Sequence, residues 1–188
     1  MKEKILIVDD SQEIRMLLGR YLKAAGYETA EAENGEAGLN QARECLPDLI
    51  LLDIIMPGID GYEVCRRLKA DEKTKKIPVI FITCFTGQDE VIEGIKAGAV
   101  DYITKPFHTP ELTARIETHL KLKLYREKVE EDKQELAKLN KQMTEFLAIA
   151  IHDLKVPLGN ISGLAKMIRD YSDMERAEIE ELSNDIIT

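Results

Sequence analysis

Short apolar runs alternate with amphipathic segments over the first 107 residues. Residues 4–8 form an almost continuous apolar run, which is typical of a strand buried on both faces. Further strands are predicted at residues 48–53, 78–83 and 100–103, and a weaker one at residues 27–32. Apolar positions at helical spacing predict helices between them, over residues 10–26, 34–45, 62–70 and 86–98. This alternation predicts an α/β fold with a five-stranded, doubly wound parallel sheet.

The remainder of the chain has a different pattern. Thr109-Pro110-Glu111 is a helix start with proline at the first helical position, and residues 111–156 contain neither glycine nor proline. A continuous helix over that stretch would be ~70 Å long. Alternating three- and four-residue steps form a heptad seam with one polar position, which predicts a coiled coil: Leu122, Tyr125, Val129, Asp132, Leu136, Leu139, Met143, Phe146 and Ala150.

A second apolar seam overlaps the first and is displaced by one residue, which resembles a coiled-coil stutter. It consists of Leu147, Ile151, Leu154, Leu158, Ile161, Ala165 and Ile168. Asp170 to Asp173 is expected to form a turn before a short second helix, so that two chains would pair their helical hairpins into a four-helix bundle. The expected domains are 1–120, a signalling helix over 121–145, and a hairpin over 146–188, which we expect to be incomplete.

Composition narrows the classes of function. The net charge is −9, and no apolar run approaches the ~18 residues of a membrane span. The acidic balance and the absence of a helix-turn-helix pattern argue against nucleic-acid binding. Three cysteines without metal-type spacing and the absence of a signal peptide predict a reduced, cytoplasmic protein.

Acidic residues follow the predicted strands at the edge where ligands of such sheets bind. Asp9 and Asp10 follow the first strand and Asp53 ends the third, while Thr83 ends the fourth and Lys105 follows the fifth. Clustered carboxylates are costly unless a hard cation neutralises them, and Mg²⁺ prefers such oxygens. A carboxylate beside the metal could attack phosphorus, with a hydroxyl and an ammonium holding the phosphoryl oxygens.

These residues resemble the receiver domain of two-component response regulators, together with the stretches Asp53-Ile54-Ile55-Met56-Pro57-Gly58-Ile59-Asp60-Gly61 and Lys105-Pro106-Phe107. The resemblance covers roughly residues 1–120 and implies a flavodoxin-like fold. It implies that Asp53 accepts a phosphoryl group, and that Asp10, Asp53 and the Ile55 carbonyl bind Mg²⁺, assisted by Asp9 through water. It further implies that Thr83 and Lys105 contact the phosphoryl oxygens and that the Lys105–Pro106 bond is cis.

The same resemblance identifies an aromatic switch. Tyr102 matches the residue that turns inward on activation, and Phe107 is expected to pack beside it.

A second resemblance lies in the long helix. Residues 146–158, which include His152, Asp153 and Pro157, are similar to the H-box of the dimerisation and histidine-phosphotransfer domain of sensor histidine kinases. It implies that His152 is a phosphoacceptor, that Asp153 orients or deprotonates it, and that Pro157 bends the helix. The family usually has Thr or Asn where this chain has Val156, which cannot hydrogen-bond, so phosphatase activity is in question.

The sequence thus predicts a receiver fused to part of a protein histidine kinase. The expected partners are a second copy of the chain, an upstream phosphodonor and a downstream response regulator. ATP would act only through a missing downstream domain, so the chain alone is expected to be inactive with ATP. Two alternatives stay open: an ATP-independent phosphotransfer protein, and a dimeric interaction module gated by receiver phosphorylation.

Overall fold

The computed structural model describes residues 2–84 and 88–185 of the chain. It divides into two compact units, Met1–Val129 and Glu130–Thr188. The first unit contains the sheet, the helices around it and the first turns of the last helix, whereas the second contains the rest of that helix.

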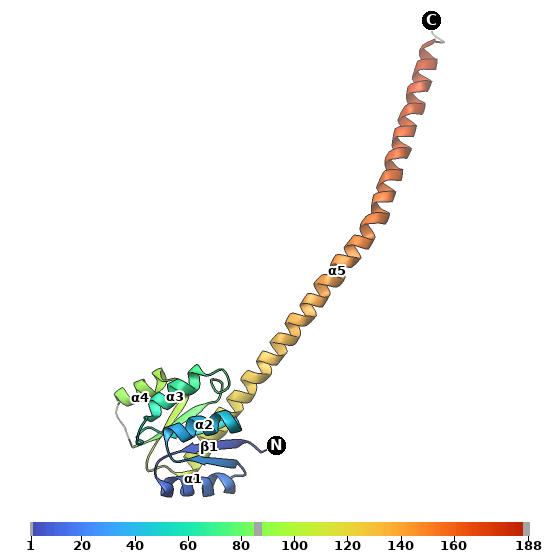
Figure 1. The fold of residues 1–188 in the computed structure, drawn as a ribbon. Helices are drawn as coiled ribbons and strands as arrows, with labels where there is room; N and C mark the ends of the chain where they lie inside the picture. The colour runs from blue at the N-terminus through green and yellow to red at the C-terminus, as the bar shows by residue number, and fades with distance from the viewer. Residues whose placement is uncertain (1, 85–87, 186–188) are drawn as a thin grey trace. The chain divides into compact units, whose positions relative to one another are not determined.

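Five parallel strands form the sheet of the first unit (Figure 1). The strands are β1 (Lys4–Val8), β2 (Glu28–Ala32), β3 (Leu49–Asp53), β4 (Val79–Thr83) and β5 (Asp101–Thr104). Their order is β2-β1-β3-β4-β5, with β3 at the centre and β2 and β5 at the edges. The predicted fold is confirmed, and every strand begins and ends within one residue of the expected position.

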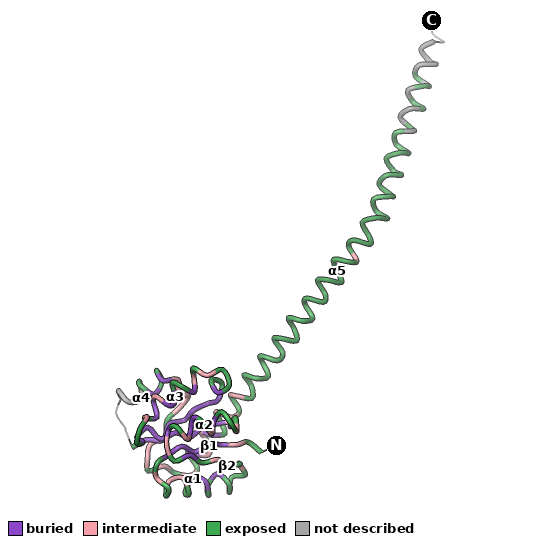
Figure 2. Tube along the Cα trace, viewed as in Figure 1, coloured by how far each residue is buried: buried purple, intermediate pink, exposed green. Residues whose placement is uncertain are grey.

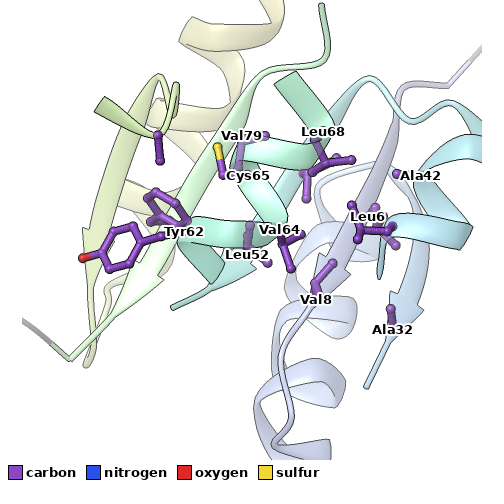
Figure 3. Packing of buried hydrophobic residues seen from close by; sticks show 14 of the residues in the cluster. Leu6, Val8, Ala32, Ala42, Leu52, Tyr62, Val64, Cys65, Leu68 and Val79 are labelled. Atoms are coloured by element: carbon purple, nitrogen blue, oxygen red, sulfur yellow. The ribbon is translucent and has the colours of Figure 1, made fainter. Parts of the chain in front are cut away.

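Helices cover both faces of the sheet, and each face has its own apolar cluster. α1 (Gln12–Ala24) and α5 (Thr109–Asp185) supply Leu18, Leu22, Leu112 and Ile116 to one cluster. α2 (Gly35–Cys45) and α3 (Gly61–Ala70) contribute to the other cluster, which Figure 3 shows, and Ala97, just after α4 (Gln88–Lys96), joins it. The expected start of α4, Thr86, lies outside the described residues. Burying both faces explains why β1, β3 and β4 are nearly continuous apolar runs, whereas the edge strands β2 and β5 are partly exposed.

Side-chain caps fix where three of these helices begin. Ser11, Asn34 and Asp60 are the N-cap residues of α1, α2 and α3, and each accepts a hydrogen bond from a backbone N–H in the first turn. Such caps satisfy donors that the helix itself leaves unpaired. Because each cap follows a strand or its loop, the caps also fix where the chain turns at the carboxyl edge of the sheet.

The last helix corrects one expectation. α5 runs from Thr109 to Asp185 without interruption, and Asp170 to Asp173 is helical, so the predicted turn and hairpin are wrong for this structure. Asp and Ser lower helix propensity by only ~0.7 kcal/mol or less each, and no glycine or proline interrupts the backbone after Gly163. Pro157 also lies within the helix.

The apolar side chains of the predicted seams are exposed along α5 (Figure 2). Val129, Leu136, Leu139 and Phe146 are all more than half exposed, as are most apolar residues of the second seam. Within the described residues, no helix is long and apolar enough to cross a membrane.

Candidate functional site

The parallel strands bring the predicted phosphorylation residues to one edge of the sheet. Asp9 directly follows β1, Asp53 is the last residue of β3, Thr83 is the last residue of β4, and Lys105 directly follows β5. Asp9, Asp53 and Thr83 are buried, at 1%, 7% and 3% exposure respectively. These polar side chains therefore lie at the end of an otherwise apolar sheet.

One ammonium group joins the two buried carboxylates. Lys105 Nζ donates to Asp9 Oδ2 at 2.8 Å and to Asp53 Oδ2 at 2.7 Å. The backbone N–H of Lys105 also donates to the carbonyl oxygen of Thr83 at 2.7 Å, which connects the end of β5 to the end of β4. The Lys105–Pro106 peptide bond is cis, as expected.

The remaining carboxylate oxygens are held by backbone donors. Asp53 Oδ1 accepts from the N–H of Ile54 at 2.7 Å and from that of Ile55 at 3.4 Å. Asp9 Oδ1 accepts from the N–H of Ser11 at 2.8 Å. Both buried side chains are thus fixed in direction, and Ile55, whose carbonyl is a predicted metal ligand, lies in the loop that holds Asp53.

Gly61 allows the start of α3 to lie against this loop. A Cβ atom at Gly61 would fall on the carbonyl oxygen of Asp53 and would lie 2.8 Å from the Cα of Ile54. The N–H of Gly61 donates to the carbonyl oxygen of Ile54 at 2.9 Å. The loop after β3 is therefore shaped by a backbone contact that only glycine permits.

The three carboxylates fit a hard divalent cation. Asp9, Asp10 and Asp53 each offer one oxygen, and these oxygens lie within 4.8 Å of one another. Mg²⁺ is bound by carboxylate, carbonyl and water oxygens, so the donors match its chemistry. Asp10 is the exposed member of the cluster and is accessible from solvent.

Burial and mutual repulsion both disfavour negative charge on the carboxylates at this edge of the sheet. Burial raises the pKa of Asp53, and the charge of Asp9 raises it further, although Lys105 acts in the opposite direction. Burial alone would lower the pKa of Lys105, but its hydrogen bonds to Asp53 and Asp9 raise it above the ordinary value. Lys105 therefore stays charged, and its single positive charge offsets only part of the negative charge of the three carboxylates.

The two predicted switch residues lie on different faces of the sheet. Tyr102 is 39% exposed, and strand alternation places it opposite its buried neighbour Ile103. Phe107 packs against the cluster that contains Ile103. The expected packing of Phe107 beside Tyr102 stays a prediction, because Phe107 follows β5 and its observed neighbours belong to the cluster around Ile103.

Sequence reasoning missed Arg15, a residue of α1 that contacts the backbone of the acidic turn. Its Nη1 donates to the carbonyl oxygen of Asp9 at 2.7 Å and to that of Asp10 at 3.1 Å. The sequence does contain one sign of this contact, which is an arginine one turn into a helix that follows an acidic pair. It was not decisive, because most arginines at such positions are solvated.

The second predicted site has a simpler geometry. His152 Nδ1 lies 3.5 Å from Asp153 Oδ1, and both side chains are about three-quarters exposed. Val156 is exposed one turn further along the helix. His152 is therefore accessible to a partner.

Comparison with known proteins assigns the first unit to a family. Residues 5–117 match the response regulator receiver domain. The response regulator PleD of Caulobacter vibrioides is 44% identical over 124 residues, covering 66% of this chain and 27% of PleD. The phosphate regulon transcriptional regulatory protein PhoB of Pseudomonas aeruginosa is 48% identical over 117 residues, covering 62% of this chain and 51% of PhoB.

A solved structure agrees with this assignment. The signal receiver domain of a signal transduction histidine kinase from Syntrophus aciditrophicus is 35% identical, with a TM-score of 0.60, over 63% of this chain and 90% of that one. The chain belongs to the response regulator receiver domain family, and its receiver is a component of two-component phosphorelay signalling. It spans between a quarter and about half of the length of the two curated relatives.

The raised pKa of Asp53 predicts how stability depends on pH. The folded state holds this proton more tightly than the unfolded chain, so stability falls as pH rises from the ordinary aspartate value of ~3.9 through the folded pKa. Asp53→Asn should therefore raise the melting temperature by a few degrees at pH 7 in EDTA, and the gain should vanish below about pH 4. Thermal unfolding followed by circular dichroism measures both values.

Asp60→Asn is the matched control, because Asp60 caps α3 outside the acidic cluster and Asn is an equally good cap. A lower melting temperature for Asp53→Asn than for wild type at pH 7 would contradict the electrostatic interpretation.

Proposed function

We propose that this chain is a phosphorylation-controlled receiver attached to the dimerisation and phosphotransfer segment of a histidine kinase. The contact of Lys105 Nζ with both Asp9 and Asp53, beside the exposed Asp10, carries the receiver part of the proposal. The fit of the carboxylates to Mg²⁺ supports Asp9, Asp10, Asp53 and the carbonyl of Ile55 as the metal site.

Phosphoryl transfer to Asp53 follows from these groups. A carboxylate oxygen of Asp53 attacks the phosphorus of a phosphohistidine or a small acyl phosphate, the bond from phosphorus to the donor breaks, and the donor leaves with that electron pair. Mg²⁺, when bound, supplies positive charge toward the phosphoryl oxygens. Lys105 would move from the carboxylate to a phosphoryl oxygen, and the hydroxyl of Thr83 would donate to another.

The effect of phosphorylation would be detected at the surface around α4 and β5. Tyr102 is exposed, so an inward rotation of its ring has a solvent-facing starting point. We propose that phosphorylation of Asp53 changes the surface around α4 and β5, with Tyr102 and Phe107 responding on their separate faces. Bistable packing of this kind is a recognised source of switching.

We propose that the second unit forms a homodimer and responds to the change in the receiver. Exposed apolar residues follow the predicted seam along α5, and a partner helix would remove them from water. We propose that His152 accepts a phosphoryl group with help from Asp153, and that an ATP-binding domain and a downstream response regulator are its partners. The similarity to a receiver that is part of a histidine kinase supports this arrangement. We propose a cytoplasmic location for the whole assembly.

Two other functions remain candidates. An ATP-independent phosphotransfer protein would use the same His152 without an ATP-binding partner. A dimeric interaction module would need only the seam of α5 and the receiver.

The first prediction concerns the receiver. Incubation with radiolabelled acetyl phosphate and Mg²⁺ should label the wild-type protein, because acetate can leave when Asp53 attacks phosphorus. Asp53→Asn should abolish the label, whereas the control Asp60→Asn should retain it, since Asp60 lies outside the acidic cluster. Undiminished labelling of the Asp53 variant would refute the assignment of the phosphoacceptor.

The second prediction concerns self-association. Light scattering at micromolar concentration should give twice the mass of one chain. The double variant Leu136→Lys/Leu139→Lys should shift the protein to the monomer, because it buries two ammonium groups in the seam. Leu124→Lys/Ile149→Lys changes two equally exposed apolar residues of α5 that lie outside both seams, and it should stay dimeric. A wild-type monomer would rule out the dimer.

The third prediction concerns His152. The chain should gain acid-labile label from radioactive ATP only when the isolated ATP-binding domain of a histidine kinase is added. His152→Gln should remove this label, and His108→Gln, at another exposed histidine, should not. Label that survives His152→Gln would eliminate the kinase function. Label obtained only from a phosphorylated receiver, and never from ATP, would favour the phosphotransfer alternative.

A further inference from the structure

Arg15 connects α1 to the turn that carries two of the three carboxylates. Its Nη1 donates to the carbonyl oxygens of Asp9 and Asp10, at 2.7 and 3.1 Å. The Arg15 side chain is only 13% exposed, and its Nε lies 4.0 Å from Glu31 Oε2 on β2. The guanidinium is therefore held between the turn and a neighbouring strand.

The two carbonyl groups lie between regular elements. β1 ends at Val8 and α1 begins at Gln12, so the carbonyl groups of Asp9 and Asp10 fall outside both the sheet and the helix. The N–H of Asp9 donates to the carbonyl oxygen of Ala32, and the backbone hydrogen bonds of α1 begin with that from the N–H of Arg15 to the carbonyl oxygen of Ser11. Because a charged donor that bonds both carbonyl oxygens favours the arrangement in which they face it, the Arg15 side chain stabilises one orientation of these two peptide groups.

Glu31 keeps the guanidinium in this position. Gly19, one turn beyond Arg15 on α1, leaves space for the carboxylate, and a Cβ atom there would lie 3.2 Å from Glu31 Oε1. Glu31 therefore reaches across α1 toward Arg15, and its charge balances a guanidinium that would otherwise repel a cation from the acidic cluster.

The orientation of the turn matters most for Asp10. The side chain of Asp9 is held directly, by the N–H of Ser11 and by Lys105 Nζ. Asp10 is exposed, so the direction of its carboxylate depends on the backbone from which it projects. Fixing the peptide groups on either side of the Asp10 Cα fixes the direction of its Cα–Cβ bond, which limits the side-chain rotamers to those that start toward the cluster.

We propose that Arg15 is a positioning residue for Mg²⁺ binding, which it promotes by holding the Asp9–Asp10 turn so that the carboxylate of Asp10 faces those of Asp9 and Asp53. This inference rests on the proposed function of the receiver. It assigns to Arg15 an effect opposite in sign to that of its charge, because a cation near the site would by itself weaken Mg²⁺ binding.

The test uses calorimetric titration of MgCl₂ into the full chain. Arg15→Gln should raise the Mg²⁺ dissociation constant roughly tenfold, as is usual when support for a metal ligand is lost. Arg15→Lys keeps the charge but replaces the rigid guanidinium, whose Nη1 reaches both carbonyl groups, with an ammonium on a more flexible stem, so a smaller rise, roughly threefold, is expected. Arg20→Gln removes the same charge from an exposed position on α1 and should leave the constant unchanged.

A second measurement separates positioning from folding. Each variant is labelled with acetyl phosphate over a range of Mg²⁺ concentrations, after circular dichroism in EDTA has confirmed that it is folded. Loss of positioning should raise the Mg²⁺ concentration for half-maximal labelling while the rate at saturating Mg²⁺ changes little. If Arg15→Gln does not fold, the same labelling experiment compares Arg15→Lys with the wild type.

Three results would overturn the inference. An unchanged Mg²⁺ dissociation constant in both Arg15 variants would show that the Asp9–Asp10 turn keeps its conformation without Arg15. A lower dissociation constant in Arg15→Gln would show that repulsion between Arg15 and Mg²⁺ outweighs any positioning effect. A wild-type chain that binds no Mg²⁺ and accepts no label would refute the proposed function together with the inference. If the wild type binds Mg²⁺ normally and the variants do not differ from it, the inference alone fails.

Discussion

The structure depends on an imbalance of charge at the carboxyl edge of the sheet, where three carboxylates meet one ammonium group. Lys105 lies between Asp9 and Asp53 and offsets part of their charge, while Asp10 adds a third carboxylate. Burial makes that imbalance expensive, which is why the pKa of Asp53 is raised. A divalent cation and a phosphoryl group are the two additions that such a site accommodates.

The rest of the first unit serves to keep these groups together. Parallel strands place their last residues at one edge, and apolar clusters on both faces leave the strands no other register. Backbone donors fix the buried carboxylates, Gly61 lets α3 approach the loop after Asp53, and Arg15 holds the turn after β1. The site is thus an arrangement of loops supported by a rigid sheet.

Sequence reasoning recovered β1, β3 and β4 because burial on both faces requires a nearly continuous apolar run. It recovered the places of Asp9, Asp53 and Lys105 because strand ends converge in this topology. It missed Arg15, whose partners are backbone carbonyl groups that leave no trace in residue identity. It failed at Asp170–Asp173, where residues that favour turns lie in a helix that nothing interrupts.

The central claim is that Asp53 receives the phosphoryl group, and chemical mapping tests it most directly. Reduction of the phosphorylated protein with borohydride converts an acyl phosphate of aspartate into homoserine, which tandem mass spectrometry locates in a peptide. The account predicts homoserine at position 53 and unmodified aspartate at positions 9 and 10. Homoserine at Asp9 or Asp10, or none in a protein that has gained the mass of a phosphoryl group, would contradict it.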